Sequence, residues 1–306
     1  MIMNKIFYLT RRNCLIYLRD KSAVFFSIMS TLIALGLMVV FLGKMNSENV
    51  LYIISNYSNA IITEKERINA SCLVQMWTLS GMISVNAVTV AFTVIGTMIH
   101  DETAKKIMAF YITPVKRLYI TLGYILSAWL ISSGMCILTL ILGDIYFMIQ
   151  GYELIQITSM LKMSGIIIIS TFTSSAIGYV IALCVHSDSG WSGVLTITGT
   201  LVGFASGIYV PISQLSHMIQ TIVKHLPVLH SAAMLRKIST ERIIDKVFEN
   251  VPNEITQVYC DSMSIDITTN GDIWRERQQI ALIIIYAVVA VIIASLITKK
   301  RKLKDR

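Results

Sequence analysis

Six long apolar stretches divide this 306-residue chain, and they constrain its fold more than any other feature. The hydrocarbon core of a bilayer is about 30 Å thick, so a spanning helix needs about 20 apolar residues. Because 55% of the residues are hydrophobic and only 14% are charged, a soluble domain could not bury the apolar surface. The sequence therefore predicts an all-α polytopic membrane protein with six transmembrane helices. The stretches cover residues 23–43, 76–99, 118–142, 163–185, 192–211 and 280–298.

The distribution of lysine and arginine predicts that both termini are cytoplasmic. With the N-terminus inside, segments 1–22, 100–117, 186–191 and 299–306 hold 15 Lys and Arg residues against 5 acids. The outer segments hold 11 Lys and Arg residues against 12 acids. This asymmetry follows the positive-inside rule. The formal net charge of +8 thus reflects membrane topology, and no nucleic-acid partner is needed to explain it.

Both ends of the chain carry basic residues next to an apolar stretch. Residues 1–22 interleave apolar and basic side chains, which predicts an interfacial helix along the inner leaflet or, alternatively, a basic topology anchor. The basic run 299–306 has the same two interpretations, contact with membrane lipid or a solvated anchor.

The polar segment 100–117 lies between two stretches that can each cross a bilayer, and its sequence is HDETAKKIMAFYITPVKR. A charged segment held at a membrane face by two spans forms a docking surface for a soluble partner. Pro114 ends a helix there and fixes the direction in which the chain leaves it.

Polar residues inside the apolar stretches are candidates for a transport pathway. Asn86, Thr89 and Thr93 share one face of the second stretch, where they either hydrogen-bond between helices or contact a substrate. Asp144 lies near the end of the third stretch. It is either an acid at the outer interface or an intramembrane acid with a function.

Glycines four residues apart in the fifth stretch predict close helix packing. Gly199, Gly203 and Gly207 let a second backbone approach, and their spacing leaves open whether it belongs to the same chain or to a second copy. The outer segment 212–279 follows. Its first part is apolar but too broken to span, which predicts a re-entrant or interfacial hairpin that turns near Pro227. Residues 239–251 then predict an amphipathic outer helix.

Catalytic and cofactor motifs are absent from the sequence. It contains no GxxxxGK[ST] phosphate loop, HExxH or GxSxG motif. Its histidines and cysteines show no metal-ligand spacing, so neither an enzyme nor a cofactor site is expected on this chain. Cys72 and Cys260 both lie outside the membrane in the predicted topology, which allows a disulfide between them.

Two motifs make the chain resemble the ABC-2 type transporter permeases, the transmembrane subunits of ATP-binding-cassette exporters. Residues 110–117, FYITPVKR, are similar to a family segment of the form DFYVSPIKR, which an acidic pair precedes. Residues 203–211 match the pattern GFxxGxYxP, and the family pattern continues at Pro227, His230 and Arg236. The resemblance covers nearly the whole chain.

The resemblance implies a dimer or heterodimer of six-helix subunits with two cytosolic ABC ATPase subunits, which would hold ATP and Mg. Segment 100–117 would be the coupling helix that docks the ATPase, through Asp101, Glu102, Phe110, Tyr111, Pro114, Lys116 and Arg117. The dimer interface would include Gly199, Gly203 and Gly207. An outer gate would include Tyr209, Pro211, Pro227 and His230.

We therefore expect a multi-pass permease of the bacterial cytoplasmic membrane that exports a hydrophobic drug or antimicrobial peptide. Lipid-linked glycans and ions are the other substrates that the resemblance allows. The alternative from another class is a polytopic membrane sensor or enzyme without transport. An enzyme should place acids or histidines in pairs at one membrane depth, and only Asp144 lies near the membrane interior.

Overall fold

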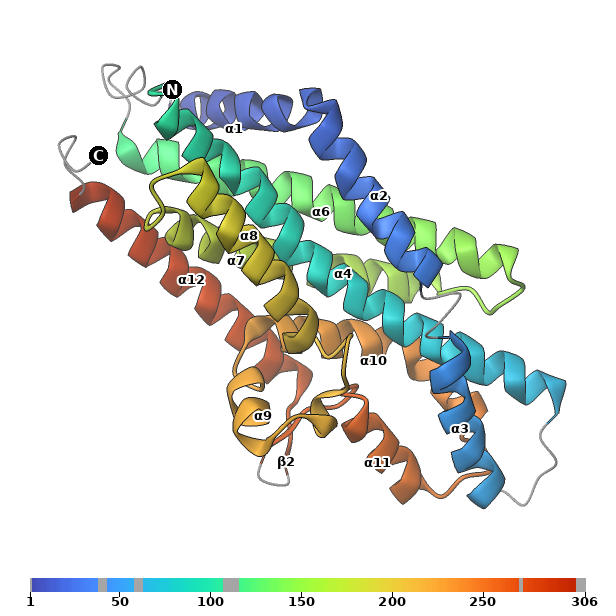
Figure 1. The fold of residues 1–306 in the computed structure, drawn as a ribbon. Helices are drawn as coiled ribbons and strands as arrows, with labels where there is room; N and C mark the ends of the chain where they lie inside the picture. The colour runs from blue at the N-terminus through green and yellow to red at the C-terminus, as the bar shows by residue number, and fades with distance from the viewer. Residues whose placement is uncertain (1, 38–42, 58–62, 107–115, 270–271, 301–306) are drawn as a thin grey trace.

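Long helices form a bundle that carries a smaller group of short elements at one end (Figure 1). The structure, a computed structural model, describes residues 2–37, 43–57, 63–106, 116–269 and 272–300. Two short antiparallel strands, paired through Thr268 and Ile273, interrupt the otherwise helical architecture. The elements are α1 (Ile2–Arg19), α2 (Lys21–Leu37), α3 (Gly43–Tyr57), α4 (Glu64–Thr103), α6 (Arg117–Ile149), α7 (Ile157–Ala182), α8 (Asp188–Ala205), η2 (Ile212–Gln214), α9 (His217–Val223), α10 (Pro227–Val247), α11 (Asn253–Ser262), β1 (Thr268–Thr269), β2 (Asp272–Ile273) and α12 (Glu276–Lys300).

Helix α4 is the central element of the bundle, since α6, α7, α8 and α10 all pack on it. It begins with a capping box, in which the Thr63 side chain accepts from the N–H of Glu66 and the Glu66 carboxylate accepts from the N–H of Thr63. Its 40 residues correspond to a length of about 60 Å, roughly twice the thickness of a bilayer core. The predicted span 76–99 therefore lies inside a helix that extends beyond it at both ends.

Among the described residues, four helices are long and apolar enough to cross a membrane, namely α4, α6, α7 and α12. The first predicted span begins in α2 and continues into 38–42, outside the described residues. The fifth corresponds to α8, which ends earlier than predicted because Gly207 adopts φ +72° and the N–H of Ile208 bonds to the carbonyl of Gly203. The count of six spans stays a prediction.

The start of α1 and the end of α12 lie at the same end of the bundle, and α9 and α10 lie toward the other (Figure 1). We call these the α1 end and the α10 end. A hydrogen bond from Arg117 to the carbonyl of Thr298, 3.4 Å long, joins the start of α6 to the end of α12. The elements that the predicted topology puts on the cytoplasmic side thus lie together at the α1 end.

The segment after Pro211 differs from the prediction. Helix α10 runs unbroken through 227–247, so the second arm of the predicted hairpin and the predicted helix 239–251 are largely one helix. Pro227 occupies the first turn of α10, where its missing N–H costs no hydrogen bond. The chain therefore reverses at 224–226, just before Pro227. Helix α10 packs on α4, α7 and α12 and leaves Glu241 and Asp245 exposed.

The disulfide that the sequence allowed does not form. Cys72 and Cys260 are both buried free thiols in the apolar core. Burial raises the pKa of Cys260 to about 12, which suppresses the thiolate that disulfide chemistry requires.

Candidate functional site

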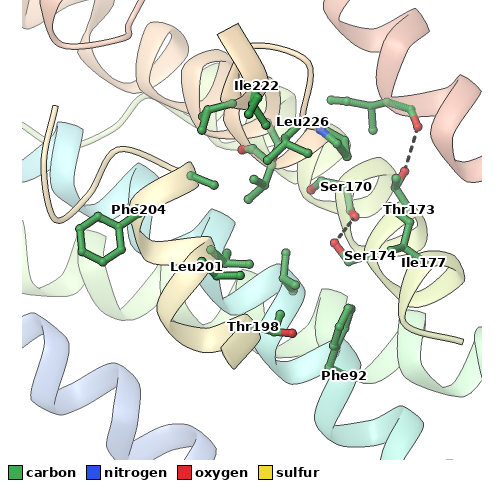
Figure 2. A pocket seen from close by; sticks show the side chains of 18 of the residues that line it. Phe92, Ser170, Thr173, Ser174, Ile177, Thr198, Leu201, Phe204, Ile222 and Leu226 are labelled. Carbon is green, nitrogen blue, oxygen red and sulfur yellow. Dashed lines mark hydrogen bonds between the residues drawn. The ribbon is translucent and has the colours of Figure 1, made fainter. Parts of the chain in front are cut away.

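An apolar cavity of about 650 Å³ lies between α8 and the helices that surround it (Figure 2). Its volume is in the range of small-molecule sites in proteins. Helices α4, α7, α8, α9, α10 and α12 all contribute to its wall, so the fold rather than any single motif builds it. The lining residues include Val88, Phe92, Ile177, Leu201, Phe204, Ile222, Leu226 and Ile283.

Most of the polar groups in the cavity wall are hydroxyls that already donate to backbone carbonyls. Ser174 donates to the carbonyl of Ser170 at 2.9 Å, and Thr173 donates to the carbonyl of Ile283 on α12 at 3.2 Å. The hydroxyl of Ser231 on α10 donates to the carbonyl of Val228. No charged side chain is among the lining residues that the structure describes. The cavity therefore suits an uncharged apolar group, because an ion would lose its hydration there without a partner.

The rim of the cavity is also apolar. Leu201 and Phe204 on α8 are 61% and 42% exposed, and Ile219 and Ile222 on α9 are 46% and 55% exposed. All four also line the cavity. An apolar ligand could therefore enter between α8 and α9 without crossing a polar surface.

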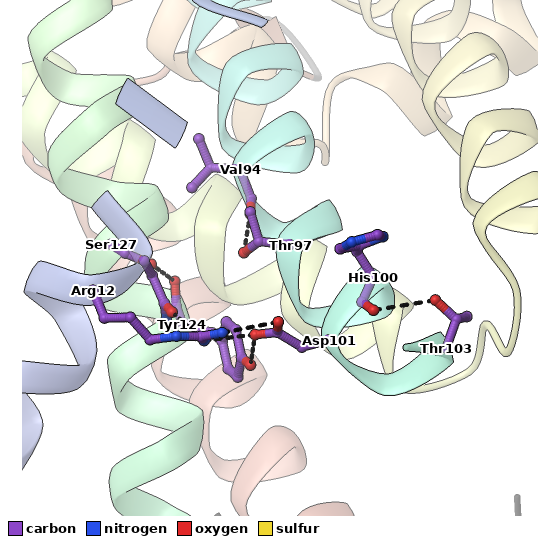
Figure 3. A network of polar contacts seen from close by, with 9 residues as sticks. Arg12, Val94, Thr97, His100, Asp101, Thr103, Tyr124 and Ser127 are labelled. Atoms are coloured by element: carbon purple, nitrogen blue, oxygen red, sulfur yellow. Dashed lines mark hydrogen bonds and ion pairs between the residues drawn. The ribbon is translucent and has the colours of Figure 1, made fainter. Parts of the chain in front are cut away.

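A polar network at the α1 end holds the last turn of α4 (Figure 3). The two terminal nitrogens of Arg12 lie 2.6 and 2.9 Å from the two carboxylate oxygens of Asp101. The hydroxyl of Tyr124 donates to the same carboxylate at 2.7 Å. Only 2% of Asp101 is exposed, and its carboxylate helps to raise the pKa of Arg12 through their hydrogen bonds. This network fastens α1 and α6 to α4.

A second contact fastens the same turn to α8. The hydroxyl of Thr103 donates to Asp188 at 2.9 Å, and His100 lies 3.9 Å from that carboxylate. Asp188 is the first residue of α8. Ser187 caps this helix, because its hydroxyl accepts a hydrogen bond from the N–H of Gly190. Together with Arg12, Asp101 and Tyr124, these contacts form what we call the α4 clamp. It joins α1, α6 and α8 to α4 immediately before segment 107–115.

The predicted docking residues divide into three groups. Asp101 is buried and ion-paired with Arg12, so its carboxylate cannot meet an ATPase. A carboxylate in apolar surroundings needs such a partner. The predicted docking role of Asp101 is therefore corrected to a role within the chain. Glu102 and Arg117 are partly buried and Lys116 is exposed. Helix α4 ends where Lys105 adopts φ +56°, so the described part of 100–117 is not a continuous helix. The predictions for Phe110, Tyr111 and Pro114 lie outside the described residues.

The three glycines predicted for the dimer interface lie in different surroundings and do not form one surface for a second chain. Gly199 faces open space, whereas a Cβ on Gly203 would collide with the ring of Tyr209 from the same chain. Gly207 lies past the end of α8 and supplies the left-handed turn that ends it. The close approach that the spacing predicted is therefore made within the chain at Gly203.

The predicted gate residues lie in different environments. Tyr209 is 59% exposed and meets Phe204 edge-on, with ring centroids 5.4 Å apart, and Pro211 precedes η2. Pro227 lines the cavity. His230 is fully buried on α10, donates from Nε2 to the carbonyl of Lys224 at 2.8 Å and has its pKa lowered by burial.

The predicted pathway residues do not line the cavity. Asn86 donates to the hydroxyl of Thr139 on α6 at 3.3 Å, and Thr89 and Thr93 donate to backbone carbonyls of α4. Asp144 accepts the N–H of Ile155 at 3.0 Å and so holds the connection between α6 and α7. The contacts of Asn86 fit the alternative of hydrogen bonding between helices.

A family model described as ABC-2 family transporter protein matches residues 50–297, which is most of the chain. No curated protein matches the sequence.

Proposed function

The chain belongs to the ABC-2 transporter family, and from that premise we propose that it is the permease subunit of an ATP-binding-cassette exporter with an apolar substrate. Family membership makes it a multi-pass membrane component of ABC transporters, which associate with ABC ATPase subunits. The observation that carries the proposal is the uncharged cavity of about 650 Å³ beside α8. The proposed setting is the bacterial cytoplasmic membrane, and ATP and Mg would bind on the partner subunit.

The apolar wall supports a hydrophobic drug or the apolar part of a peptide as the substrate. The lining side chains carry no charge, and their hydroxyl donors are engaged with carbonyls at Ser174, Thr173 and Ser231. An ion or a glycan would need polar partners in the wall. Efflux of an apolar compound is therefore favoured over the other substrates of the family.

The α4 clamp supports a route from ATP hydrolysis to the cavity. The segment that follows Thr103 would dock the ATPase, with Phe110 and Tyr111 as apolar anchors and Pro114 at the exit. A displacement of that segment would pull on α1 through Asp101 and on α8 through Asp188. Because α8 forms one wall of the cavity, its rigid-body movement would open or close the site.

The outward side of α8 supports assembly with a second permease chain, either a copy or a homologue. Ile197 is 61% exposed there, and Gly199 has open space beside it. An apolar helix face of this kind faces lipid or another helix in a membrane. The dimer interface would then use this face and not Gly203 or Gly207.

The test is to isolate the tagged chain from its native membranes in a mild detergent and to identify its partners by mass spectrometry. We expect a soluble protein with a Walker A sequence. Reversing the charges with Glu102→Lys and Lys116→Glu should remove it. Reversing two exposed charges toward the α10 end, with Glu241→Lys and Lys162→Glu, should not. Isolation without any ATPase in several mild detergents would favour the sensor or enzyme alternative.

A further inference from the structure

Arg236 is a cation buried in the protein without a hydrogen-bond partner. The residue is 0% exposed on α10, and none of its three guanidinium nitrogens has a partner among the described residues. Its guanidinium carbon lies 4.1 Å from the centre of the Trp77 ring. Burial lowers the pKa of Arg236 to about 9, so the side chain is still charged at neutral pH. A cation–π contact offsets only part of the cost of removing an unpaired charge from water.

Two glycines provide the space that the guanidinium group occupies. One terminal nitrogen lies 3.0 Å from the position that a Cβ on Gly81 would take, and the other lies 3.6 Å from the same position at Gly207. Gly81 belongs to α4, and Gly207 belongs to the turn that ends α8. The nitrogens of Arg236 thus point at two backbones that offer them no acceptor. An anion is the natural partner for a guanidinium group in this state.

The guanidinium group lies beyond the cavity, toward the start of α4. Val88 lines the cavity, and Gly81 precedes it by seven residues, which is about 10 Å along the same face of an α-helix. Ser231 lines the cavity on α10, five residues before Arg236. Ala205 lines it just before the turn at Gly207. The turn after α8 therefore separates an apolar compartment from an unpaired cation.

We propose that the cavity and Arg236 form one site for an amphiphile that carries a single carboxylate or phosphate group. The apolar part fills the cavity, and the anion pairs with Arg236 once the turn after α8 has moved aside. A guanidinium group binds both oxygens of such an anion, and a neutral amphiphile leaves it unpaired. This inference rests on the proposed function, because it names the substrate class of the same cavity.

The test uses one probe in a charged and a neutral form, dansylaminoundecanoic acid and its methyl ester. The full chain is placed in nanodiscs of phosphatidylcholine, and binding is measured as energy transfer from tryptophan to dansyl above the signal of empty nanodiscs. We expect the acid to bind about tenfold more tightly than the ester, as one charge-assisted pair provides. Ser174→Leu, which fills the cavity, should weaken both probes.

Substitutions on α10 assign the preference to Arg236. Arg236→Gln should remove the preference for the acid over the ester, and Arg236→Lys should retain part of it. Arg242→Gln is the control, since Arg242 lies on the same helix, is mostly exposed and pairs with Glu153. The comparison of acid and ester on the unmodified chain needs no variant, so a variant that does not fold leaves the test intact.

Two results would overturn the inference, and they differ in what they say of the proposed function. Equal binding of acid and ester that Ser174→Leu weakens would reject the anion site and keep the apolar cavity as a substrate site. Binding of neither probe above empty nanodiscs would reject both the anion site and the cavity as a site for such ligands. The isolation of an ATPase with the chain is independent of both results.

Discussion

Arg12 and Asp101 form a two-point ion pair, 2.6 and 2.9 Å long, although 89 positions separate them in the chain. The pair lies where α1 crosses the last turn of α4, and Tyr124 of α6 donates to the same carboxylate. Because Asp101 is almost fully buried and only a third of the Arg12 side chain is exposed, solvent screens the pair weakly. The N-terminal helix is therefore fixed to the turn from which the docking segment leaves.

Asp101→Asn should loosen α1, since it leaves Arg12 without its counter-charge. We expect a loss of about 3 kcal/mol of stability, at the low end for a broken buried pair because Arg12 is partly exposed. The measurement is the thermal midpoint of the purified chain. Exchanging the pair with Arg12→Asp and Asp101→Arg should recover part of the loss. If Asp101→Asn leaves the thermal midpoint unchanged and the exchange does not raise it, the role of the pair is contradicted.

The reactivity of the Cys14 thiol measures whether Asp101→Asn loosens α1. Cys14 faces α6, with its sulfur 3.9 Å from the carbonyl of Ser127, and burial raises its pKa, so it should react slowly with maleimide. In a Cys184→Ser background, which removes the exposed thiol, Asp101→Asn should speed the labelling of Cys14. Equal labelling rates with and without Asp101→Asn would show that α1 stays in place.

Gly123 sets the distance between α1 and α6. A Cβ there would lie 2.8 Å from the Cβ of Leu9, which cannot rotate away, so Gly123→Ala should cost about 1–3 kcal/mol through overpacking. Gly134→Ala on the same helix is the matched control, because nothing lies within 4 Å of its added Cβ. Thermal midpoints compare the two. Equal midpoints for both variants would contradict the packing of α1 on α6.

Filling the cavity should impair transport. Ser174→Leu loses one hydrogen bond within α7 and places an isobutyl group in the cavity wall. Ser164→Leu is the control on α7, because Ser164 makes the same type of bond to the carbonyl four residues earlier and does not line the cavity. The measurement is ATP-dependent uptake of the neutral dansyl ester by inverted membrane vesicles. We expect a loss of uptake for Ser174→Leu only, and equal uptake for the two variants would exclude the cavity from the pathway.

His230 should make the stability of the protein depend on pH. Burial lowers its pKa from 6.5, so below that pH the unfolded chain binds a proton that the folded chain does not. Stability should therefore fall as the pH drops from 6.5 through the lowered pKa of the folded state. His230→Gln should flatten this fall in the thermal midpoint, whereas His217→Gln, at an exposed position of α9, should retain it. If both variants retain the fall of the thermal midpoint with pH, groups other than His230 cause it.

The long helices could be predicted because apolar length is a local property of the sequence. Each predicted span lies within or overlaps a helix, from α2 to α12. Helix α10 could not be delimited in this way. His230 and Arg236 interrupt its apolar pattern in the sequence, yet both are fully buried, and its contacts with α4 and α7 hold it as one helix.

The candidate site could be predicted less well than the helices, because residues far apart in the sequence form it. The polar segment 100–117, which contains Asp101 and Glu102, could be recognised from the sequence, but its charges alone did not show that Asp101 pairs with Arg12 across the bundle. The cavity is lined by ordinary apolar and hydroxyl side chains from six helices, so no sequence motif predicts it. Arg236 was visible as part of a family pattern, and only the structure shows that it lacks a partner.

The most direct measurement is the rate of ATP hydrolysis by the complex isolated on the tagged chain from its native membranes. The proposed function predicts hydrolysis that exceeds the background from untagged membranes. It also predicts a fall of about tenfold for Glu102→Lys with Lys116→Glu, as the loss of a few interface contacts would produce. The control pair Glu241→Lys with Lys162→Glu should keep the rate. An isolated chain without associated hydrolysis, or hydrolysis that the first pair of charge reversals leaves unchanged, would contradict the account.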